Sequence, residues 1–597
     1  MSDRASTPIS KKLGPTRLTT IVQQASVGYP PQPVDMPRLS TVIAITWAAL
    51  PAAGWADHVA QASHGMVASS QTLASQAGVQ IMKEGGNAVD AACAVALALA
   101  VVHPAAGNLG GGGFMLIRMA DGRAVAIDYR EAAPAAATET MYQDVQGNIL
   151  PGASLVGYRA SGVPGTVAGL SLAHQKFGKL PWAAVVKPAI DLASDGFTLS
   201  DGLARELKSS RNLAKFPESR RIFQRNGDFY RAAETFKQPE LAATLERLAN
   251  QGPSDFYRGK TAALIADAMK QNGLITREDL AGYRAVVRKP LVGSYHGYQV
   301  VTMPPPSSGG VALLEALNLL SGFDLDSSGF DTAKTDHLLV ESMRRAFADR
   351  SKYLGDPDFV KVPVSGLTSP RYADKLRATI SDSQASPSDT NGPGDPTPYE
   401  SSETTHFSVV DAQGNAVSNT YTLNFGFGSG VTIPGAGFLM NDEMDDFTSK
   451  PGVPNGFGLI QGAANAIQPH KRPLSSMTPT ILVKNGKPIL VLGSPGGPTI
   501  ITSVLQVVVN VVDHGMTLQE AVAAPRIHHQ WLPDAIDVEE GAIPQAVREV
   551  LTRNGYRFSD GEGRHWGDVE AIAIDPQTAL RIGVSDPRSG DAGAAGY

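Results

Sequence analysis

Two hairpin patterns constrain the fold of this chain more than any other feature of its sequence. The first runs from Phe114 to Tyr129 around the turn signal Asp121-Gly122, and the second from Ile481 to Leu492 around Asn485-Gly486. An alanine-rich helical pattern precedes the first hairpin, and an apolar helical pattern follows the second. Hairpins joined to helices predict an α/β (α+β) protein with mostly antiparallel sheets covered by helices.

Helical patterns account for much of the remaining sequence. Pro104 and the Gly/Pro-rich stretches between these patterns mark where helices end and loops begin. The expected helical regions are Ser70–Glu84, Ala88–Val101, most of residues 160–350, and Thr499–Val512.

Charge and cysteine content exclude some classes of protein. The formal net charge of the 597-residue chain is −6, with no basic stripe to offset it, which argues against a nucleic acid as the main partner. Cys93 is the only cysteine, so no intrachain disulfide can form. Because it lies in a run of alanines and valines, we expect a small buried hydrophobic side chain rather than a nucleophile.

The N-terminal segment, residues 1–56, has the pattern of a secretory signal. Arg38 precedes the apolar stretch Leu39–Leu50, and a small-x-small site ends at Ala56. The apolar stretch is too short to span a bilayer comfortably, which disfavours a membrane anchor. Signal peptides usually have brief basic regions, so either Met36 is the true start or the extension before it is unstructured.

The segment from about residue 380 to residue 403 differs from its surroundings. It is rich in Ser, Pro, Gly and Asp and has almost no apolar side chain to bury, which predicts a flexible linker. Directly after it, Thr405–Val410 and Ala416–Leu423 read as strands around the turn 411–415.

The junction Glu403-Thr404 allows a specific chemistry. Cleavage before Thr404 would free an α-amine, which titrates near neutrality, on the same residue as the hydroxyl. This amine can act as the general base for its own Oγ, the threonine route to an activated nucleophile. Taken alone, Thr404 is more simply an ordinary β-branched strand residue.

A set of motifs in a fixed order resembles the γ-glutamyltranspeptidases, which belong to the N-terminal-nucleophile hydrolases. The resemblance covers about Gly65 to the C-terminus, and seven weak motifs in order make a specific signal. They are Gly107–Phe114, Asp128–Glu131, Thr404–Asp411, Tyr421–Asn424, Asn441–Phe447, Pro473–Met477 and Gly493–Gly497, followed by Ser585–Arg588 and the terminal Gly596-Tyr597.

The resemblance implies a four-layer αββα sandwich and a precursor that cuts itself between Glu403 and Thr404. Residues 57–403 would form a large subunit and residues 404–597 a small subunit, together making one αββα unit. Thr404 would then attack a γ-glutamyl amide to give an acyl-enzyme that water, an amino acid or a peptide resolves.

The resemblance also implies binding positions for the two charged groups of a γ-glutamyl donor. The α-carboxylate needs a cation and hydroxyl or amide donors, and the α-ammonium needs acceptors. Each of these residues alone has a simpler explanation, such as a surface ion pair for Arg130 or a solvated loop acid for Asp446. The matching positions are Arg130, Asn424, Ser475 and Ser476 for the carboxylate, and Glu443 and Asp446 for the ammonium.

The glycines that match the family's oxyanion hole are Gly496 and Gly497. They precede the helical pattern 499–512, where backbone N–H groups are free and the helix dipole favours negative charge. Neither this loop nor Gly107–Gly113 fits a phosphate-binding motif, because no Lys-Ser/Thr follows. For the second loop we expect close backbone packing beneath the site. Thr422 matches a position that supports the nucleophile, although it is also plain strand material.

The stretch Lys450–Gly458 resembles the lid loop of many bacterial members. Phe457 stands where some members have tyrosine. Without the hydroxyl, one possible hydrogen bond to Asn424 is lost, which predicts a looser lid.

These observations imply partners, location and two rival functions. Expected partners are glutathione or similar γ-glutamyl compounds, amino acid or dipeptide acceptors, and the two subunits for each other; the protein is expected to be exported, periplasmic or secreted. His528-His529 and the other histidines lack metal-ligand spacing, so neither metal nor other cofactor is expected. The rivals are a cephalosporin (glutaryl) acylase of the same fold and a processed but inactive binding protein.

Overall fold

The computed structural model of the protein describes residues 58–399, 410–559 and 566–597. The N-terminal extension with the predicted signal peptide, residues 1–56, lies outside the described residues. So do the predicted cleavage junction Glu403-Thr404 and the strand expected from Thr405.

A four-stranded antiparallel sheet contains the first predicted hairpin. The strands lie in the order β10-β3-β4-β7, so the hairpin β3–β4 is central and β10 joins its other side. The register pairs Thr422 at the end of β10 with Gly112 at the start of β3. The bounds are β3 Gly112–Arg118, β4 Ala124–Tyr129, β7 Val286–Arg288 and β10 Ala416–Thr422.

A seven-stranded antiparallel sheet contains the second predicted hairpin. Its order is β1-β17-β16-β12-β11-β9-β8, with the hairpin β11–β12 at its centre. The bounds are β1 Val59–Ala62, β8 Leu291–Tyr295, β9 Tyr298–Thr302, β11 Thr480–Lys484, β12 Lys487–Gly493, β16 Glu570–Ile574 and β17 Arg581–Val584.

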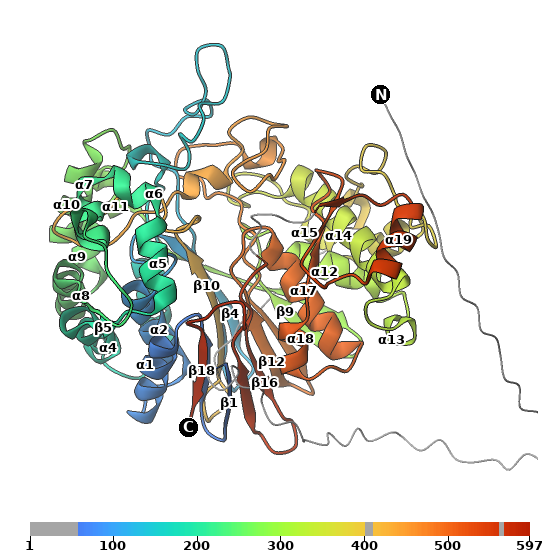
Figure 1. The fold of residues 1–597 in the computed structure, drawn as a ribbon, viewed down its shortest axis with the longest axis horizontal. Coiled ribbons are helices and arrows are strands. Elements are labelled where there is room, and N and C mark those ends of the chain that lie inside the picture. The colour runs from blue at the N-terminus through green and yellow to red at the C-terminus, as the bar shows by residue number, and fades with distance from the viewer. Residues whose placement is uncertain (1–57, 400–409, 560–565) are drawn as a thin grey trace, which may run out of the picture. The chain divides into compact units, whose positions relative to one another are not determined.

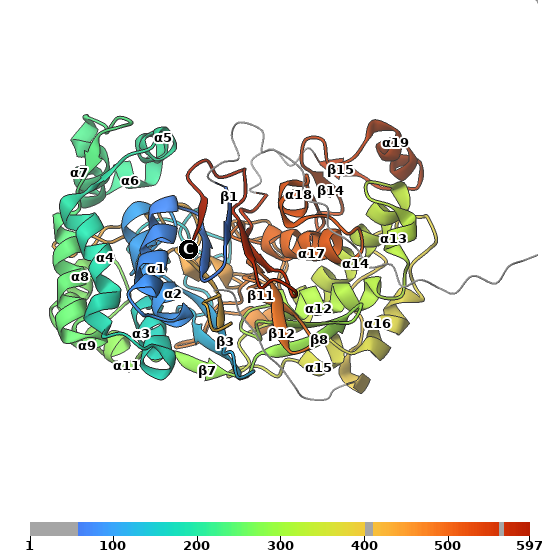
Figure 2. The ribbon, with the colours of Figure 1, turned by 90° about the horizontal axis from the view of Figure 1, so that it is seen from below.

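The two sheets pack face to face between two helical layers. Strand β10 lies against β12, helices α2 and α3 cover the smaller sheet, and α12, α17 and α18 cover the larger one (Figure 1, Figure 2). This order of layers confirms the predicted αββα sandwich. The helix bounds are α1 Thr72–Lys83, α2 Ala88–Val102, α3 Thr166–Phe177, α12 Gly309–Leu320, α14 Ala333–Tyr353, α17 Thr499–Val512 and α18 Leu518–Ala523.

The local sequence of helix α2 explains where this helix begins and why it is buried. Asn87 and Asp90 form a capping box at its start, which satisfies backbone N–H groups that would otherwise lack partners. The helix is apolar all round and entirely buried between α1 and the smaller sheet. Cys93 is buried within it, as expected, and burial raises the pKa of its thiol.

Both sheets combine strands from either side of residue 404. In the smaller sheet, β10 follows that residue whereas β3, β4 and β7 precede it. In the larger sheet, β11 and β17 follow residue 404, and they pair with β9 and β1, which precede it. The N- and C-terminal ends of the described chain also pair, through β2 (Met66–Ser69) and β18 (Gly593–Gly596).

The mainly helical expectation for residues 160–350 misses three strands. Strands β7, β8 and β9 occupy residues 286–302 and extend one edge of each sheet. They are short, and Lys289-Pro290 and the turn at His296-Gly297 interrupt them, so no strand shows a long alternation. Strand β7 pairs with β4 and β9 with β11, both remote in sequence, whereas β8 pairs with its neighbour β9 in a hairpin.

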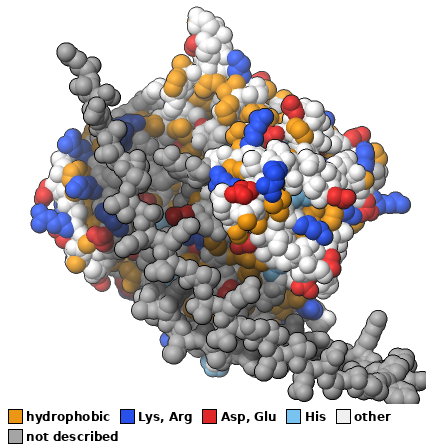
Figure 3. All heavy atoms as spheres, turned by 45° about the vertical axis from the view of Figure 1, so that its right-hand side comes forward, with side chains coloured by type: hydrophobic (Ala, Val, Ile, Leu, Met, Phe, Trp, Pro, Cys, Tyr) orange, Lys and Arg blue, Asp and Glu red, His pale blue; other side chains and the backbone are white. Residues whose placement is uncertain are grey.

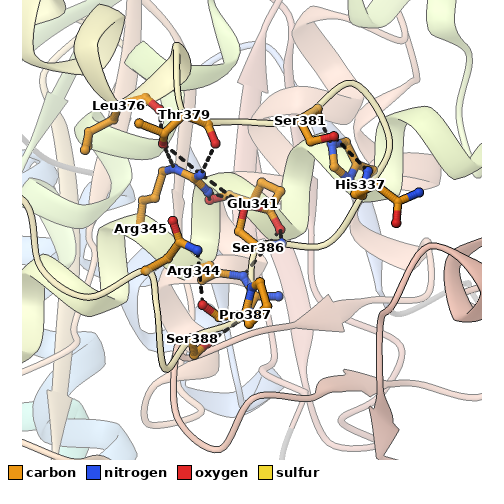
Figure 4. A network of polar contacts seen from close by, with 12 residues as sticks. His337, Glu341, Arg344, Arg345, Leu376, Thr379, Ser381, Ser386, Pro387 and Ser388 are labelled. Carbon is orange, nitrogen blue, oxygen red and sulfur yellow. Dashed lines mark hydrogen bonds and ion pairs between the residues drawn. The ribbon is translucent and has the colours of Figure 1, made fainter.

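The described part of the expected linker is residues 380–399. This segment has little regular structure, but it is docked on α14 by hydrogen bonds (Figure 4). The backbone N–H of Ser386 donates to Glu341 at 3.1 Å, and His337 contacts the carbonyl of Ser381 at 2.7 Å. Further along, the N–H of Gly394 donates to Asp349 at 2.6 Å.

Composition alone could not reveal this docking, because the contacts are polar. Ser388 is 3% exposed although it is surrounded by Pro and Asp in the sequence. Its hydroxyl accepts from Arg344 at 2.6 Å and its N–H donates to Asp534 at 2.9 Å. Backbone and serine groups can thus be ordered by buried charged side chains without any apolar residue of their own.

The surface carries mixed charge. On the described part of the face in Figure 3, acidic and basic side chains are interspersed, without a continuous basic stripe. Within residues 58–399, 410–559 and 566–597, none of the helices combines the length and the apolar character needed to cross a bilayer.

Candidate active site

A buried ionic cluster connects the two halves of the chain. Arg130 directly follows β4, while Glu443 and Asp446 lie in the single 3-10 turn η4 (Glu443–Asp446). The guanidinium of Arg130 donates to both carboxylates, through Nη1 to Glu443 and through Nη2 to Asp446. The structure therefore brings together three residues that the resemblance implied for opposite ends of the ligand.

Backbone contacts fix the orientation of Arg130. Its Nε donates to the carbonyl of Pro473 at 3.2 Å, and its own N–H donates to Asp128 at 3.0 Å. Arg130 is fully buried, so these contacts leave its side chain a single direction.

Acids outnumber bases in this cluster. Arg130 is accompanied by three buried acids and by the partly exposed Asp446. We call these five residues the acidic cluster: Arg130, Glu131, Asp442, Glu443 and Asp446. Neither carboxylate oxygen of Glu131 receives a hydrogen bond, and its nearest described cation is Arg130 at 3.6 Å.

The excess of acid appears in the pKa values. Burial raises the pKa of Glu131 to about 7, although Arg130 opposes the shift. Burial likewise raises the pKa values of Asp442, Glu443 and Asp446, and Arg130 does not fully offset this for the last two. Burial thus makes these carboxyls harder to ionise than carboxyls in water.

The two predicted serines lie on a segment held by the start of α12. Ser475 accepts a backbone hydrogen bond from Ser308 at 2.7 Å, and its own N–H donates to Pro306 at 2.9 Å. Ser475 is 1% exposed and Ser476 is 8% exposed. The loop before α12, rich in Pro and Ser, therefore fixes the backbone of Ser475.

Arg350 on α14 is a site residue that the sequence analysis missed. Its Nη2 donates to the hydroxyl of Ser476 at 3.1 Å and its Nε to the hydroxyl of Ser308 at 2.9 Å. Gln461 links it to the acidic cluster, because the Gln461 amide donates to the carbonyl of Asp446 at 3.1 Å. A long helix with three arginines in its second half gives no sequence sign of which one faces the site.

Asn424 and Thr422 form a small turn at the end of β10. The N–H of Asn424 donates to Thr422 Oγ1 at 2.8 Å, and its side-chain amide donates to the carbonyl of Asp442 at 3.1 Å. Asn424 has a φ of +85°, a conformation that asparagine tolerates better than most residues. The role of Thr422 beside the nucleophile stays a prediction, because Thr404 lies outside the described residues.

Gly496 and Gly497 lie directly before α17, as predicted. Their φ values are +131° and +61°, which side chains rarely adopt. A Cβ on Gly497 would come within 2.7 Å of the Phe457 ring, so the predicted lid residue lies directly on this glycine.

The predicted lid residue Phe457 has a partner that the sequence analysis did not identify. Its ring stacks on Phe425 with centroids 4.3 Å apart and an interplanar angle of 12°. The adjacent Gly456 N–H donates to Asp445 at 2.9 Å. The lid loop is thus held by an aromatic stack and by a hydrogen bond to a carboxylate. The hydroxyl of a tyrosine at position 457 would have added one further hydrogen bond.

The glycine loop 107–113 packs closely, as expected. A Cβ on Gly110 would lie 2.2 Å from the carbonyl oxygen of Leu439, and one on Gly111 2.1 Å from that of Thr422. On Gly112, a Cβ would meet the Glu131 carboxyl at 2.7 Å. These glycines let β10 and the acidic cluster approach the loop. Within the described ranges, no group of three or more His, Cys, Asp or Glu residues could hold a metal ion.

Comparison with known proteins identifies the family. The γ-glutamyltranspeptidase family model matches residues 74–596. The chain belongs to the γ-glutamyltranspeptidase family. It is 52% identical to the glutathione hydrolase proenzyme of Escherichia coli over 543 residues, 90% of this chain and 93% of that one.

Solved structures agree with this γ-glutamyltranspeptidase assignment. The crystal structure of a cephalosporin acylase from Bacillus halodurans matches 94% of this chain and 99% of its own, with a TM-score of 0.79 and 30% identity. The Helicobacter pylori γ-glutamyltranspeptidase structure matches 55% of this chain and 95% of its own, with a TM-score of 0.55 and 46% identity. The resemblance drawn from the ordered motifs is confirmed.

Proposed function

We propose that this γ-glutamyltranspeptidase is a glutathione hydrolase and γ-glutamyltransferase that first cuts itself between Glu403 and Thr404. The α-amine freed on Thr404 serves as general base for its hydroxyl, which attacks the γ-glutamyl amide. The resulting ester is resolved by water or by the amine of an amino acid or peptide. The relatives named as proenzymes support the processing step.

The arrangement of strands supports a stable pair of subunits after cleavage. Each sheet joins strands from residues 57–403 to strands from residues 404–597 through backbone hydrogen bonds. The cut therefore leaves the αββα sandwich intact, and the two fragments remain associated as a heterodimer.

The acidic cluster is the observation that carries the choice of substrate. Acids outnumber Arg130 in this cluster and burial raises their pKa values, which supports a site for an additional cation. A γ-glutamyl group supplies that cation as its α-ammonium, whereas a glutaryl group does not. Ser475 and Ser476 lie beside this cluster and suit the α-carboxylate.

Oxyanion stabilisation and access complete the proposed site. Gly496 and Gly497 precede α17, where backbone N–H groups can stabilise the negative oxygen of a tetrahedral intermediate. Phe457, lying on Gly497, would cover the bound donor. Residues 1–56 would direct the precursor for export to the periplasm or medium.

Two experiments test the proposal. Denaturing electrophoresis with N-terminal sequencing should show a small fragment that begins at Thr404 in the unsubstituted protein and no cleavage in Thr404→Ala. The processed enzyme should prefer γ-glutamyl-p-nitroanilide over glutaryl-p-nitroanilide. An uncut chain, a fragment that begins elsewhere, or a preference for the glutaryl compound would overturn the proposal.

A further inference from the structure

Arg350 is a buried cation without an acid of its own. It is 2% exposed, and no carboxylate oxygen in the described part of the chain lies within the 4.0 Å of an ion pair. A buried charge is costly unless a counter-charge or hydrogen bonds compensate for it. Burial lowers the pKa of Arg350 to about 10, partly offset by Asp446, so the group stays charged at neutral pH.

Its hydrogen bonds lead to the two serines of the proposed carboxylate site. Arg350 donates to Ser476 Oγ directly, and to Ser308 Oγ, which in turn donates to the carbonyl of Ser475 at 2.5 Å. The third contact, from Nη1 to Gln461 Oε1, is long at 3.4 Å. One guanidinium thus contacts Ser476 directly and is linked to the Ser475 carbonyl through Ser308.

This geometry determines what the Ser476 hydroxyl can do. A serine hydroxyl has one proton to donate and two lone pairs to accept with. Arg350 occupies one lone pair, and no acceptor in the described residues takes the proton. The proton is therefore free to be donated to a ligand, and the adjacent positive charge strengthens that donation.

The charge of Arg130 is already matched, in contrast to that of Arg350. Arg130 donates to Glu443 and Asp446, two acids that outweigh its single charge. The hydrogen bonds of Arg350 go to neutral groups only, and Asp446 acts on it without a direct ion pair. An anionic group bound at Ser475 and Ser476 would provide the counter-charge that Arg350 lacks.

We propose that Arg350 is a positioning residue for the α-carboxylate of the donor: it orients Ser476 to donate to that carboxylate and places a second positive charge behind it. This inference rests on the proposed function, since it assigns the carboxylate to the Ser475-Ser476 segment. Arg350 acts through Ser476 and does not itself need to touch the donor.

The test measures how Arg350→Met binds three ligands of the processed enzyme, by competition against γ-glutamyl-p-nitroanilide or by calorimetry. L-Glutamate has both charged groups, glutarate lacks the ammonium, and 4-aminobutyrate lacks the α-carboxylate. We expect affinity for L-glutamate and glutarate to fall by a common factor of about 10 to 100, with 4-aminobutyrate unchanged. Equal losses for all three ligands, or no loss, would overturn the inference.

Two further variants separate positioning from folding. Arg345→Met removes another buried arginine of α14, which contacts Glu341 and Thr379 away from the serines, and should leave the three ligands in their original ratio. Ser476→Ala should make the effect of Arg350→Met clearly smaller, because only the contribution of the positive charge then remains to be lost. Additive losses would show that Arg350 does not act through Ser476.

Failure of the proposed function gives a different pattern. A protein that prefers glutaryl-p-nitroanilide would contradict the ammonium assignment, yet its binding of glutarate would still report on Arg350. The Arg350→Lys variant, which keeps the charge but loses the planar fork, should lie between Arg350→Met and the unsubstituted enzyme.

Discussion

The acidic cluster and the ionic network of α14, on which residues 380–399 dock, have opposite balances of acidic and basic side chains. The second, which we call the α14 network, consists of His337, Glu341, Arg344 and Arg345, which Figure 4 shows, and of Asp534, which accepts from Arg344. There two arginines meet two acids, and Glu341 receives hydrogen bonds from Tyr556, Arg345 and the backbone of Ser386. In the acidic cluster three acids, Glu131, Glu443 and Asp446, share Arg130, and the oxygens of Glu131 receive no hydrogen bond.

The pKa shifts of the two networks have opposite signs. Burial works against Glu341, but Arg344 and Arg345 outweigh it and hold its pKa below the ordinary value. The pKa of Asp534 is also lowered, by His529, Ser388 and Arg344 against its partial burial. In the acidic cluster burial prevails, and the pKa values are raised. We infer that a network whose acids and arginines balance stabilises the fold, whereas a network with fewer cations than acids is suited to bind a cationic ligand group.

The largest expected effect is on stability, from opening the α14 network. Arg344→Met leaves Glu341 and Asp534 with one arginine fewer and should lower the free energy of unfolding by about 3 kcal/mol. Urea unfolding of the Thr404→Ala precursor, which stays a single chain under the proposal, measures this change. Proteases should then cut between residues 381 and 391. A loss below about 1 kcal/mol would contradict a balanced network.

Removing a charge from the acidic cluster should not lower the free energy of unfolding but should reduce catalytic activity. Asp446→Asn removes one excess negative charge, so the empty protein should be at least as stable as before. Without that charge the α-ammonium loses a partner, and kcat/KM for γ-glutamyl-p-nitroanilide should fall about 100-fold.

Glutaryl-p-nitroanilide is the control substrate for Asp446→Asn. It has no ammonium, so its kcat/KM should change little or rise. An equal fall for both substrates would mean that Asp446 supports the fold of the site and does not recognise the ammonium.

The sequence predicts what is local and misses what depends on distant partners. The hairpin β11–β12 and helix α17 fall where Asn485-Gly486 and the apolar pattern place them, because turn chemistry and periodicity act over a few residues. The strands β7 and β9 pair with β4 and β11 across long stretches of chain, which the sequence did not indicate; the local hairpin β8–β9 was missed as well.

The site shows the same division. Arg130, Glu443 and Asp446 could be chosen through the ordered family motifs, and the structure brings them together. Their direct contact with one another was not foreseen, since the motifs assign them to different ends of a ligand. Arg350 could not be distinguished from Arg344 by residue type, because position around α14 decides that one faces serines and the other Asp534.

The opposite pKa shifts predict opposite responses to pH. Carboxyls with a raised pKa, such as Glu131 at about 7, contribute stability below the unfolded value of about 4.3 and lose it as the pH rises through 7. Glu341, with a lowered pKa, contributes stability above that unfolded value and loses it as the pH falls. Removing the acid excess with Asp446→Asn should therefore flatten the stability profile between pH 5 and pH 7.

Ligand binding offers a direct measure of the raised pKa values. The ammonium of L-glutamate favours the charged carboxylates, so binding at pH 6.5 should release about one proton from the acidic cluster. Calorimetry in two buffers of different ionisation enthalpy measures the release. Glutarate, without an ammonium, should release less, and an enthalpy independent of the buffer would contradict the acid excess.

The smallest expected effects come from two serines, one hydrogen-bonded to the α14 network and one beside the acidic cluster. Ser388 and Ser476 each accept a hydrogen bond from a buried arginine, at 2.6 and 3.1 Å. Ser388→Ala should lower the free energy of unfolding by about 1 kcal/mol and leave ligand binding unchanged, because its partner is structural. Ser476→Ala should change stability less and weaken the binding of glutarate. If Ser388→Ala weakened the binding of glutarate and Ser476→Ala caused the larger loss of stability, the assignment of one network to stability and the other to ligand recognition would be wrong.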